Sequence, residues 1–150
     1  MAIDLTPQSP YHLPSGTGKA LVWFGSTIMQ KASAPELGVT EVILHPGEEP
    51  PFHIHRNEDE WLYVLEGQVT FHVGGDQYRG SAGDFVCYPR GIAHTFTIES
   101  SSARFLVINS PGGFERMFER GPKTPEEAAA AMEAFGMKVV APHPRQITAA

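Results

Sequence analysis

Short apolar runs, separated by turn-forming residues at a spacing of roughly ten residues, recur from residue 20 to residue 109. Each run has the length and the β-branched and aromatic content of a strand. Glycine, proline and acidic residues fill the gaps, as they do in all-β sandwiches and barrels rather than in βαβ units. The pattern predicts an antiparallel all-β fold, with strands at residues 20–29, 38–44, 61–67, 68–73, 83–89, 94–98 and 103–108.

The chain has 150 residues, which is the length of about one domain. We expect one domain over residues 1–150, with an N-terminal arm at residues 1–19, the β-sandwich at residues 20–110 and a helical C-terminal extension at residues 111–150. The extension contains a run from Thr124 to Gly136 with helical signals at both ends. Thr124 is the expected N-cap, followed by Pro125 and by Glu127 as the partner in a capping box, and Gly136 ends the helix.

Composition limits the partners and the compartment. Seventeen acidic residues against eleven basic residues give a net charge of −6, and the basic residues are scattered along the chain. We therefore expect no nucleic-acid partner. The first residues lack the features of a signal peptide, and no apolar run approaches the length of a membrane span. Cys87 is the only cysteine, which favours a reducing compartment, so we expect a cytoplasmic protein without a membrane partner.

The stretch HIHRNEDE, at residues 53–60, carries more metal-binding side chains than a polar turn requires. If the segment before it is extended, His53 and His55 point to the same side, because side chains alternate along a strand. A return strand beside the first would bring a carboxylate next to this pair. Periodicity does not distinguish Glu58 from Glu60, which share a parity, whereas Asp59 belongs to the opposite face.

A third imidazole would have to come from elsewhere in the chain, and His94 is the best candidate because it follows a turn at the start of a predicted strand. Three imidazoles and a carboxylate suit iron, nickel, cobalt, manganese, copper or zinc, with positions left open for a substrate. The sequence thus predicts one divalent transition metal per chain.

Structural roles are the more common alternative for several residues. For the histidines without matched spacing we expect hydrogen-bonded structural groups; these are His12, His45, His72 and His143. For Glu58 and Asp59 the default is a solvated turn. For the aromatic residues in or beside the site strands we expect core packing; these are Phe52, Trp61, Tyr63, Phe71, Phe85, Tyr88 and Phe96. The helically spaced Phe114, Met117 and Phe118 either cover the mouth of the barrel or, more simply, pack against the sheet.

Two spacings identify a family resemblance. Five residues separate Gly47 from His53, and one residue separates His53 from His55. Four residues then precede Glu60, and six more precede Gly67. This series resembles the first signature motif of the cupin superfamily at every fixed position.

The second cupin motif follows in the expected order. Five residues separate Gly83 from Pro89, one separates Pro89 from Gly91, and two separate Gly91 from His94. The motif often ends in Asn four positions after its histidine, whereas this chain has Ile98 there. The difference removes a polar neighbour but no ligand.

The resemblance implies that His53, His55, Glu60 and His94 are the metal ligands, which selects Glu60 over Glu58. It also implies a jelly roll of six to eight strands with the metal inside. Beyond the motifs, residues 11–142 resemble small single-domain cupins grouped with bacterial quercetin 2,3-dioxygenases. The fold expected from this resemblance is therefore an all-β cupin jelly roll with a short C-terminal helical extension.

The same resemblance implies a metal-dependent dioxygenase that cleaves a flavonol-like or other aromatic or enolic small molecule with dioxygen. Glu60 would then be the catalytic base as well as a ligand. The alternative is a non-redox metal-dependent cyclase or isomerase of polyketide-like substrates, and a non-catalytic small-molecule-binding cupin is the third reading. We expect a homodimer, because the arm before Tyr11 has few apolar residues with which to anchor itself and similar proteins exchange such arms.

Overall fold

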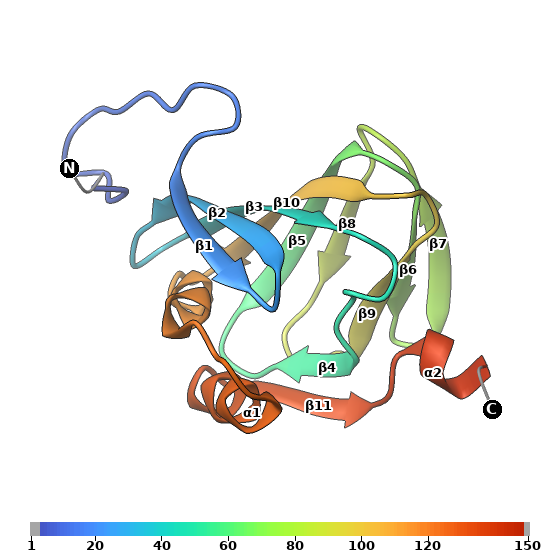
Figure 1. Cartoon of the computed structure of the whole chain (residues 1–150). Helices are drawn as coiled ribbons and strands as arrows, with labels where there is room; N and C mark the ends of the chain where they lie inside the picture. Colours follow the sequence, from blue (N-terminus) through green and yellow to red (C-terminus); the bar gives the residue numbers. More distant parts are fainter. Residues whose placement is uncertain (1–3, 149–150) are drawn as a thin grey trace.

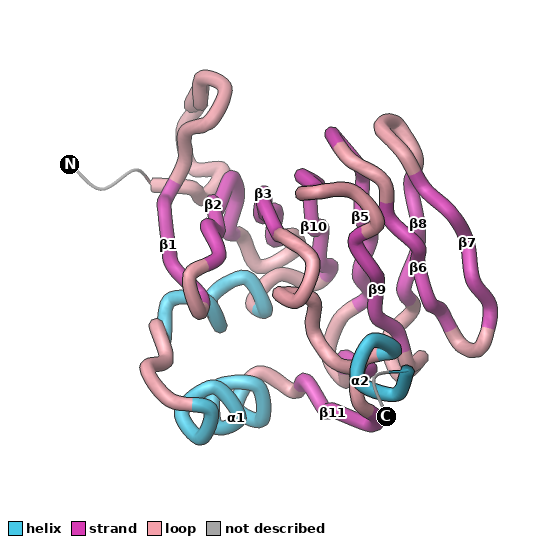
Figure 2. The backbone as a smooth tube through the Cα atoms, turned by 45° about the vertical axis from the view of Figure 1, so that its right-hand side comes forward, coloured by secondary structure: helices cyan, strands magenta, loops and turns pink. Residues whose placement is uncertain are grey.

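The computed structural model describes residues 4–148, which form two antiparallel sheets packed face to face (Figures 1 and 2). The six-stranded sheet has the order β1 (Lys19–Trp23), β2 (Ser26–Ser33), β3 (Gly38–Leu44), β10 (Ala103–Ser110), β5 (Asp59–Glu66) and β8 (Phe85–Tyr88). The five-stranded sheet has the order β11 (Met137–Ala141), β4 (Phe52–His55), β9 (His94–Ile98), β6 (Val69–Val73) and β7 (Asp76–Gly80). The predicted all-β jelly roll is confirmed.

The core lies between the inner faces of the two sheets. Along β5, Leu62 and Val64 are 1% and 0% exposed, whereas Tyr63 between them is 40% exposed. This alternation is the period-two pattern of a strand with one buried face. The buried core residues are Ile28, Val42, Leu44, Leu62, Val64, Val69, Phe71, Val86, Tyr88, Phe96, Ile98, Ala103 and Phe105.

The strand that follows the histidine pair does not lie beside it, so the expected return strand is wrong. β4 pairs with β9 and β11, whereas β5 pairs with β10 and β8 in the other sheet. Residues 56–58 therefore carry the chain across the sandwich rather than through a hairpin. As a consequence, the start of β5 faces the histidines from the opposite sheet.

The predicted C-terminal helix is confirmed as α1 (Pro125–Ala134). The Thr124 hydroxyl accepts a hydrogen bond from the Glu127 backbone N–H at 3.1 Å, as expected of an N-cap. The Glu127 carboxylate accepts from the backbone N–H of Lys123 rather than that of Thr124, so the capping box closes one residue earlier than predicted. A 3₁₀ helix, η1 (Phe114–Arg120), precedes α1.

The expectation that residues 111–150 are helical is partly wrong, because this segment also contains the strand β11. β11 pairs with β4 and places Lys138 opposite Ile54. In Figure 1, α1 and β11 run along the lower edge of the molecule beneath β4. Only Met137 of this strand is buried, so the segment lacks the apolar alternation that identifies a core strand such as β5. A short helix, α2 (Pro144–Thr148), follows it.

The N-terminal arm is anchored on its own chain, contrary to expectation. Leu5 is 5% exposed, and its carbonyl accepts a hydrogen bond from the Ser33 backbone N–H. The Tyr11 hydroxyl donates to the Lys31 carbonyl at 2.8 Å. Over residues 4–148, no helix has the length and apolar character required to span a lipid bilayer.

Candidate metal centre

Strand β4 places two imidazoles on the inner side of the sandwich. His53 and His55 are 4% and 1% exposed, while Ile54 between them faces away. Their ring centroids lie 5.0 Å apart. The side shared by the two histidines follows directly from the alternation of an extended segment.

The third imidazole comes from the neighbouring strand. His94 is the first residue of β9 and pairs in register with His53, and their ring centroids lie 4.4 Å apart. Nδ1 of His53 lies 2.7 Å from the Pro51 carbonyl, and Nδ1 of His94 lies 3.0 Å from the Ile92 carbonyl. Each Nδ1–H therefore donates to backbone, which leaves Nε2 of both rings available as a ligand atom.

Glu60 completes the cluster from the opposite sheet. Its Oε2 lies 3.2 Å from Nε2 of His94, and its Oε1 lies 3.5 Å from Nε2 of His55. The Asn109 side-chain amide donates to Oε1 at 3.2 Å and holds the carboxylate in place. Glu58 lies on the other side of His55, with its Oε1 at 3.6 Å from Nδ1.

The four residues singled out by the sequence are brought together and buried. One ligand atom from each of His53, His55, Glu60 and His94 lies within 4.8 Å of the other three. Neither ring nitrogen of His55 has a hydrogen bond among the described residues, although buried polar atoms are normally paired. Three imidazoles and one carboxylate form a donor set that fits a divalent transition metal, and such an ion would satisfy these atoms.

His53 and Glu60 have the protonation states that ligation requires, whereas His55 has to lose a proton when a metal binds. Burial and the neighbouring imidazoles of His94 and His55 lower the pKa of His53 to about 3, so its ring is neutral. Burial acts to lower the pKa of His55, but the carboxylates of Glu60 and Glu58 raise it to about 9. Burial acts to raise the pKa of Glu60, yet His55 and His94 hold it well below its usual range. A divalent cation would supply the positive charge that His55 otherwise provides to Glu60.

Sequence reasoning missed three neighbours of the cluster. Glu58 is 3% exposed rather than solvated. Tyr88 stacks on His94 with centroids 4.0 Å apart and planes at 17°, and Asn109 contacts Glu60 as described above. The inward direction of Tyr88 follows from the alternation of β8, and Glu58 lies only three residues from His55. The Asn109 contact depends instead on how β10 pairs with β5.

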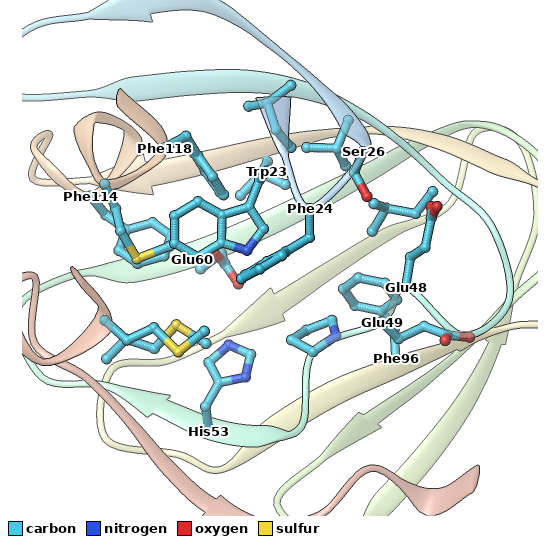
Figure 3. A pocket seen from close by; sticks show the side chains of 18 of the residues that line it. Trp23, Phe24, Ser26, Glu48, Glu49, His53, Glu60, Phe96, Phe114 and Phe118 are labelled. Atoms are coloured by element: carbon cyan, nitrogen blue, oxygen red, sulfur yellow. The ribbon is translucent and has the colours of Figure 1, made fainter. Parts of the chain in front are cut away.

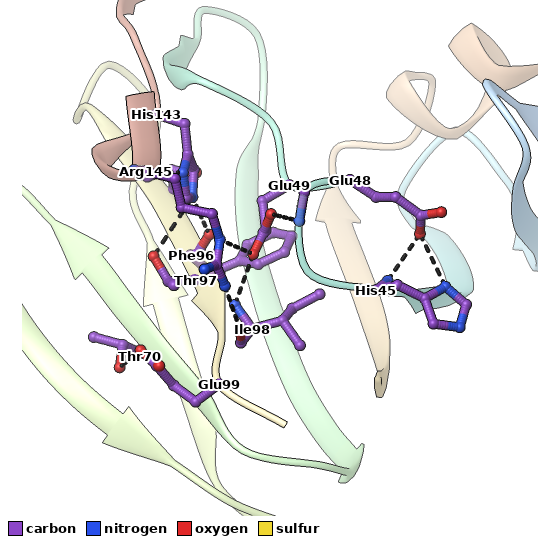
Figure 4. Close-up of polar contacts among 12 residues, drawn as sticks. His45, Glu48, Glu49, Thr70, Phe96, Thr97, Ile98, Glu99, His143 and Arg145 are labelled. Carbon is purple, nitrogen blue, oxygen red and sulfur yellow. Dashed lines mark hydrogen bonds and ion pairs between the residues drawn. The ribbon is translucent and has the colours of Figure 1, made fainter. Parts of the chain in front are cut away.

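The remaining histidines do not join the cluster. His45, His72 and His143 make the polar contacts expected of structural groups, whereas His12 is exposed. Nε2–H of His143 donates to the Phe96 carbonyl at 2.9 Å (Figure 4). His72 lies 3.0 Å from the Thr97 hydroxyl, and His45 contacts Glu48. The expectation of core packing holds for Phe71, Tyr88 and Phe96, which are buried, but it is wrong for Tyr63 and Phe85, which are 40% and 56% exposed.

An apolar pocket of about 340 Å³ opens onto the cluster (Figure 3). His53, His55 and Glu60 form part of its wall. Most other lining residues are aromatic, aliphatic or methionine side chains, and Glu48, Glu49 and Ser26 are polar exceptions. The side chains of Phe114, Met117 and Phe118 belong to this wall and also pack against α1 and β11, so η1 serves both packing and pocket formation.

A family model covers the part of the chain that contains the cluster. The family model described as a cupin domain matches residues 40–109, a span that contains all four clustered residues.

Similar proteins differ in the share of their length that this chain covers. Quercetin 2,3-dioxygenase of Bacillus subtilis (strain 168) is 25% identical over 113 residues, which are 73% of this chain and 34% of that protein. The tetracenomycin polyketide synthase protein TcmJ of Streptomyces glaucescens is 30% identical over 92 residues, which are 61% of this chain and 58% of that protein. The chain therefore spans about a third of the first relative and less than two thirds of the second.

Among solved structures, KdgF from Halomonas sp. superposes with a TM-score of 0.64 at 21% identity, over 70% of this chain and 96% of that one. This similarity shows a shared fold.

Proposed function

This chain belongs to the cupin superfamily, and we propose that it is a metal-dependent enzyme acting on a flat, apolar small molecule. The observation that carries the proposal is that three of the four clustered residues also line the pocket. A molecule in this pocket would lie against the donors that hold the metal. A purely structural metal site would be closed off by protein ligands instead.

In this proposal His53, His55, His94 and Glu60 are the ligands of one divalent transition metal per chain. When bound, such a metal supplies Lewis acidity and, if it is iron, nickel, cobalt, manganese or copper, a partner for dioxygen.

Glu60 has a second proposed role, as the base that accepts the proton of an enolic hydroxyl of the substrate. The carboxylate is ionised because His55 and His94 hold its pKa low. Asn109 binds Oε1 and fixes the orientation of the group. η1 and the β1–β2 hairpin contribute apolar walls to the pocket onto which this carboxylate opens.

The pocket favours an uncharged aromatic substrate over a phosphorylated or acidic one. Among the described residues that line it, none is Lys or Arg, and Glu48 and Glu49 add negative charge. Away from the proposed metal, an anionic group would meet these carboxylates and no cationic side chain in the pocket wall. Flat aromatic rings instead find aromatic partners in Trp23, Phe96 and Phe114.

The preferred activity is cleavage of a flavonol-like or other enolic ring by dioxygen, supported by the similarity to the Bacillus subtilis dioxygenase. The second candidate is a cyclase or isomerase reaction without dioxygen on a polyketide-like substrate, supported by the similarity to TcmJ. A non-catalytic binding role is less favoured, because the complete set of four metal donors lies beside an open pocket.

Oxygen uptake distinguishes these candidates. We would remove metal from the protein, reload separate samples with each of the six metals, and record oxygen consumption with quercetin as the flavonol. Uptake that depends on metal and is absent in His94→Ala supports the dioxygenase. Uptake that persists without metal contradicts it. Metal-dependent turnover of a polyketide-like compound under anaerobic conditions would instead support the cyclase or isomerase.

We also propose a cytoplasmic homodimer. Its support is the outer face of the six-stranded sheet, where Ile43, Tyr63 and Phe85 are 39%, 40% and 56% exposed. Exposed apolar side chains on one face are typical of subunit contacts. Sedimentation at the mass of a monomer would contradict the dimer.

A further inference from the structure

The hairpin between β1 and β2 holds an aromatic residue in a backbone conformation that aromatic residues rarely adopt. Trp23 pairs with Ser26, so Phe24 and Gly25 alone form the turn, with φ of 48° and 82°. Positive φ at both central positions is the geometry of a type I′ turn, which favours Asn-Gly or Gly-Gly. Within residues 4–148, Phe24 is the only non-glycine residue with a positive φ.

Core packing does not compensate for this conformation. The Phe24 side chain is 50% exposed, and its aromatic neighbour is Trp23, with centroids 5.9 Å apart and planes at 87°. A residue that strains its backbone without being buried points to a functional constraint at that position.

The position of the ring suggests the constraint. Phe24 and Trp23 line the pocket, and in Figure 3 their rings lie across it from His53. The half-exposed Phe24 ring is therefore at the opening of the pocket toward solvent.

A series of edge-to-face ring contacts connects this opening to the metal centre. Trp23 contacts Phe118 at 5.4 Å, Phe118 contacts Phe114 at 5.9 Å, and Phe114 contacts the His55 imidazole at 4.4 Å. Phe24 thus ends one continuous aromatic wall that begins at a proposed metal ligand. A flat ligand placed with one end at the cluster would lie along this wall.

We propose that Phe24 is a specificity-determining residue, whose ring contacts the outer end of a flat aromatic ligand bound in the pocket. The inference rests on the proposed function, because it requires a small molecule beside the metal centre. Its consequence is that stability and binding oppose each other at this position: the side chain that suits the turn best is not the one that suits the ligand.

Phe24→Asn separates the two effects, because it creates the Asn-Gly sequence that a type I′ turn prefers. We expect the variant to unfold at a temperature about 2–4 °C higher than the wild type. The same variant should bind quercetin about three- to tenfold more weakly, since an aromatic contact is lost. A merely structural role for Phe24 would not raise stability and lower affinity together.

Binding would be measured without oxygen, on zinc-loaded protein, from quenching of Trp23 fluorescence. A Trp61→Phe background removes the second tryptophan. Phe24→Tyr should retain affinity, and Val22→Ala is the matched control because Val22 is 65% exposed on the same hairpin and is absent from the pocket wall.

Two results for Phe24→Asn would each overturn this inference but leave the proposed function standing. One is a quercetin affinity equal to that of the wild type, and the other is a lower unfolding temperature. A wild-type protein that binds no quercetin contradicts the aromatic substrate of the proposed function, and the inference with it.

Discussion

Oε1 of Glu58 lies 3.6 Å from Nδ1 of His55, and within the part of the chain that the structure describes neither atom has a hydrogen bond. Both side chains are almost fully buried, at 3% and 2% exposure. A carboxylate on the far side of a ligating imidazole fixes its tautomer and orientation. We therefore expect Glu58 to position His55 when the metal is bound.

Removing this carboxylate should weaken metal binding. Glu58→Ala is expected to lower zinc affinity about 10- to 100-fold, because the His55 ring loses the group that orients it. Competition with a chromogenic chelator measures the change. Glu58→Gln retains an acceptor oxygen and should recover part of the affinity. Asp59→Asn is the control, since Asp59 contacts Arg90 on the other face; wild-type affinity in Glu58→Ala would contradict the role.

Metal should stabilise the fold through the four clustered residues. At a free zinc concentration one hundred times the dissociation constant, the free energy of unfolding should rise by about 2.7 kcal/mol. His53→Ala should abolish this rise, whereas His72→Ala, outside the cluster, should retain it. Thermal unfolding with and without zinc gives the answer, and an equal rise in all three proteins would exclude the cluster as the site.

Glu49 should make stability depend on pH. Its side chain is 1% exposed and accepts hydrogen bonds from the backbone N–H groups of Ile98 and Gly47 and from Arg145 (Figure 4). Burial acts to raise the pKa of Glu49, but these donors outweigh it and lower the pKa. A lowered folded-state pKa means that the stabilisation is present above the unfolded value and is lost as the pH falls through the folded value.

We expect Glu49→Gln to reduce the free energy of unfolding by about 1–3 kcal/mol at pH 7. The difference from the wild type should shrink below about pH 4.5, where the unfolded carboxyl is protonated. Urea unfolding at pH 7 and at low pH tests both statements. Glu48→Gln, at a more exposed position, should change stability by less than about 1 kcal/mol. A difference that is constant with pH would contradict the assignment.

Ile98 replaces the asparagine that often ends the second cupin motif, and its place in the core explains why a polar side chain is absent. Ile98 is 1% exposed and packs within the main core cluster. Ile98→Asn should lower the free energy of unfolding by about 2–5 kcal/mol, because it removes apolar contacts and buries an amide. Ile98→Val should lower it by only about 0.5–1.5 kcal/mol. Chemical denaturation measures both, and a neutral Ile98→Asn would show that the core accommodates the amide.

Local patterns were sufficient for the features that depend on neighbours in sequence. The shared side of His53 and His55 follows from alternation within one strand. The start of α1 follows from a cap between Thr124 and Glu127, three residues apart. Most strands of the core carry enough β-branched and aromatic residues to be recognised. The strand predicted at residues 20–29 is instead the hairpin of β1 and β2, and the exposed strand β7 was missed. β11 was missed because only its first residue is buried, so its position depends on pairing with β4 rather than on its own pattern.

The sequence by itself determined most of the core strands, the histidine pair on one strand face and the residue types of a metal site, because these depend on contacts a few residues apart. Only the tertiary structure decided that Glu60 reaches the histidines from the opposite sheet and that Asn109 contacts its carboxylate. It also decided that an apolar pocket opens onto the cluster. These relationships arise where segments distant in sequence pack together. The periodicity within one segment does not show which face of another segment that segment will contact.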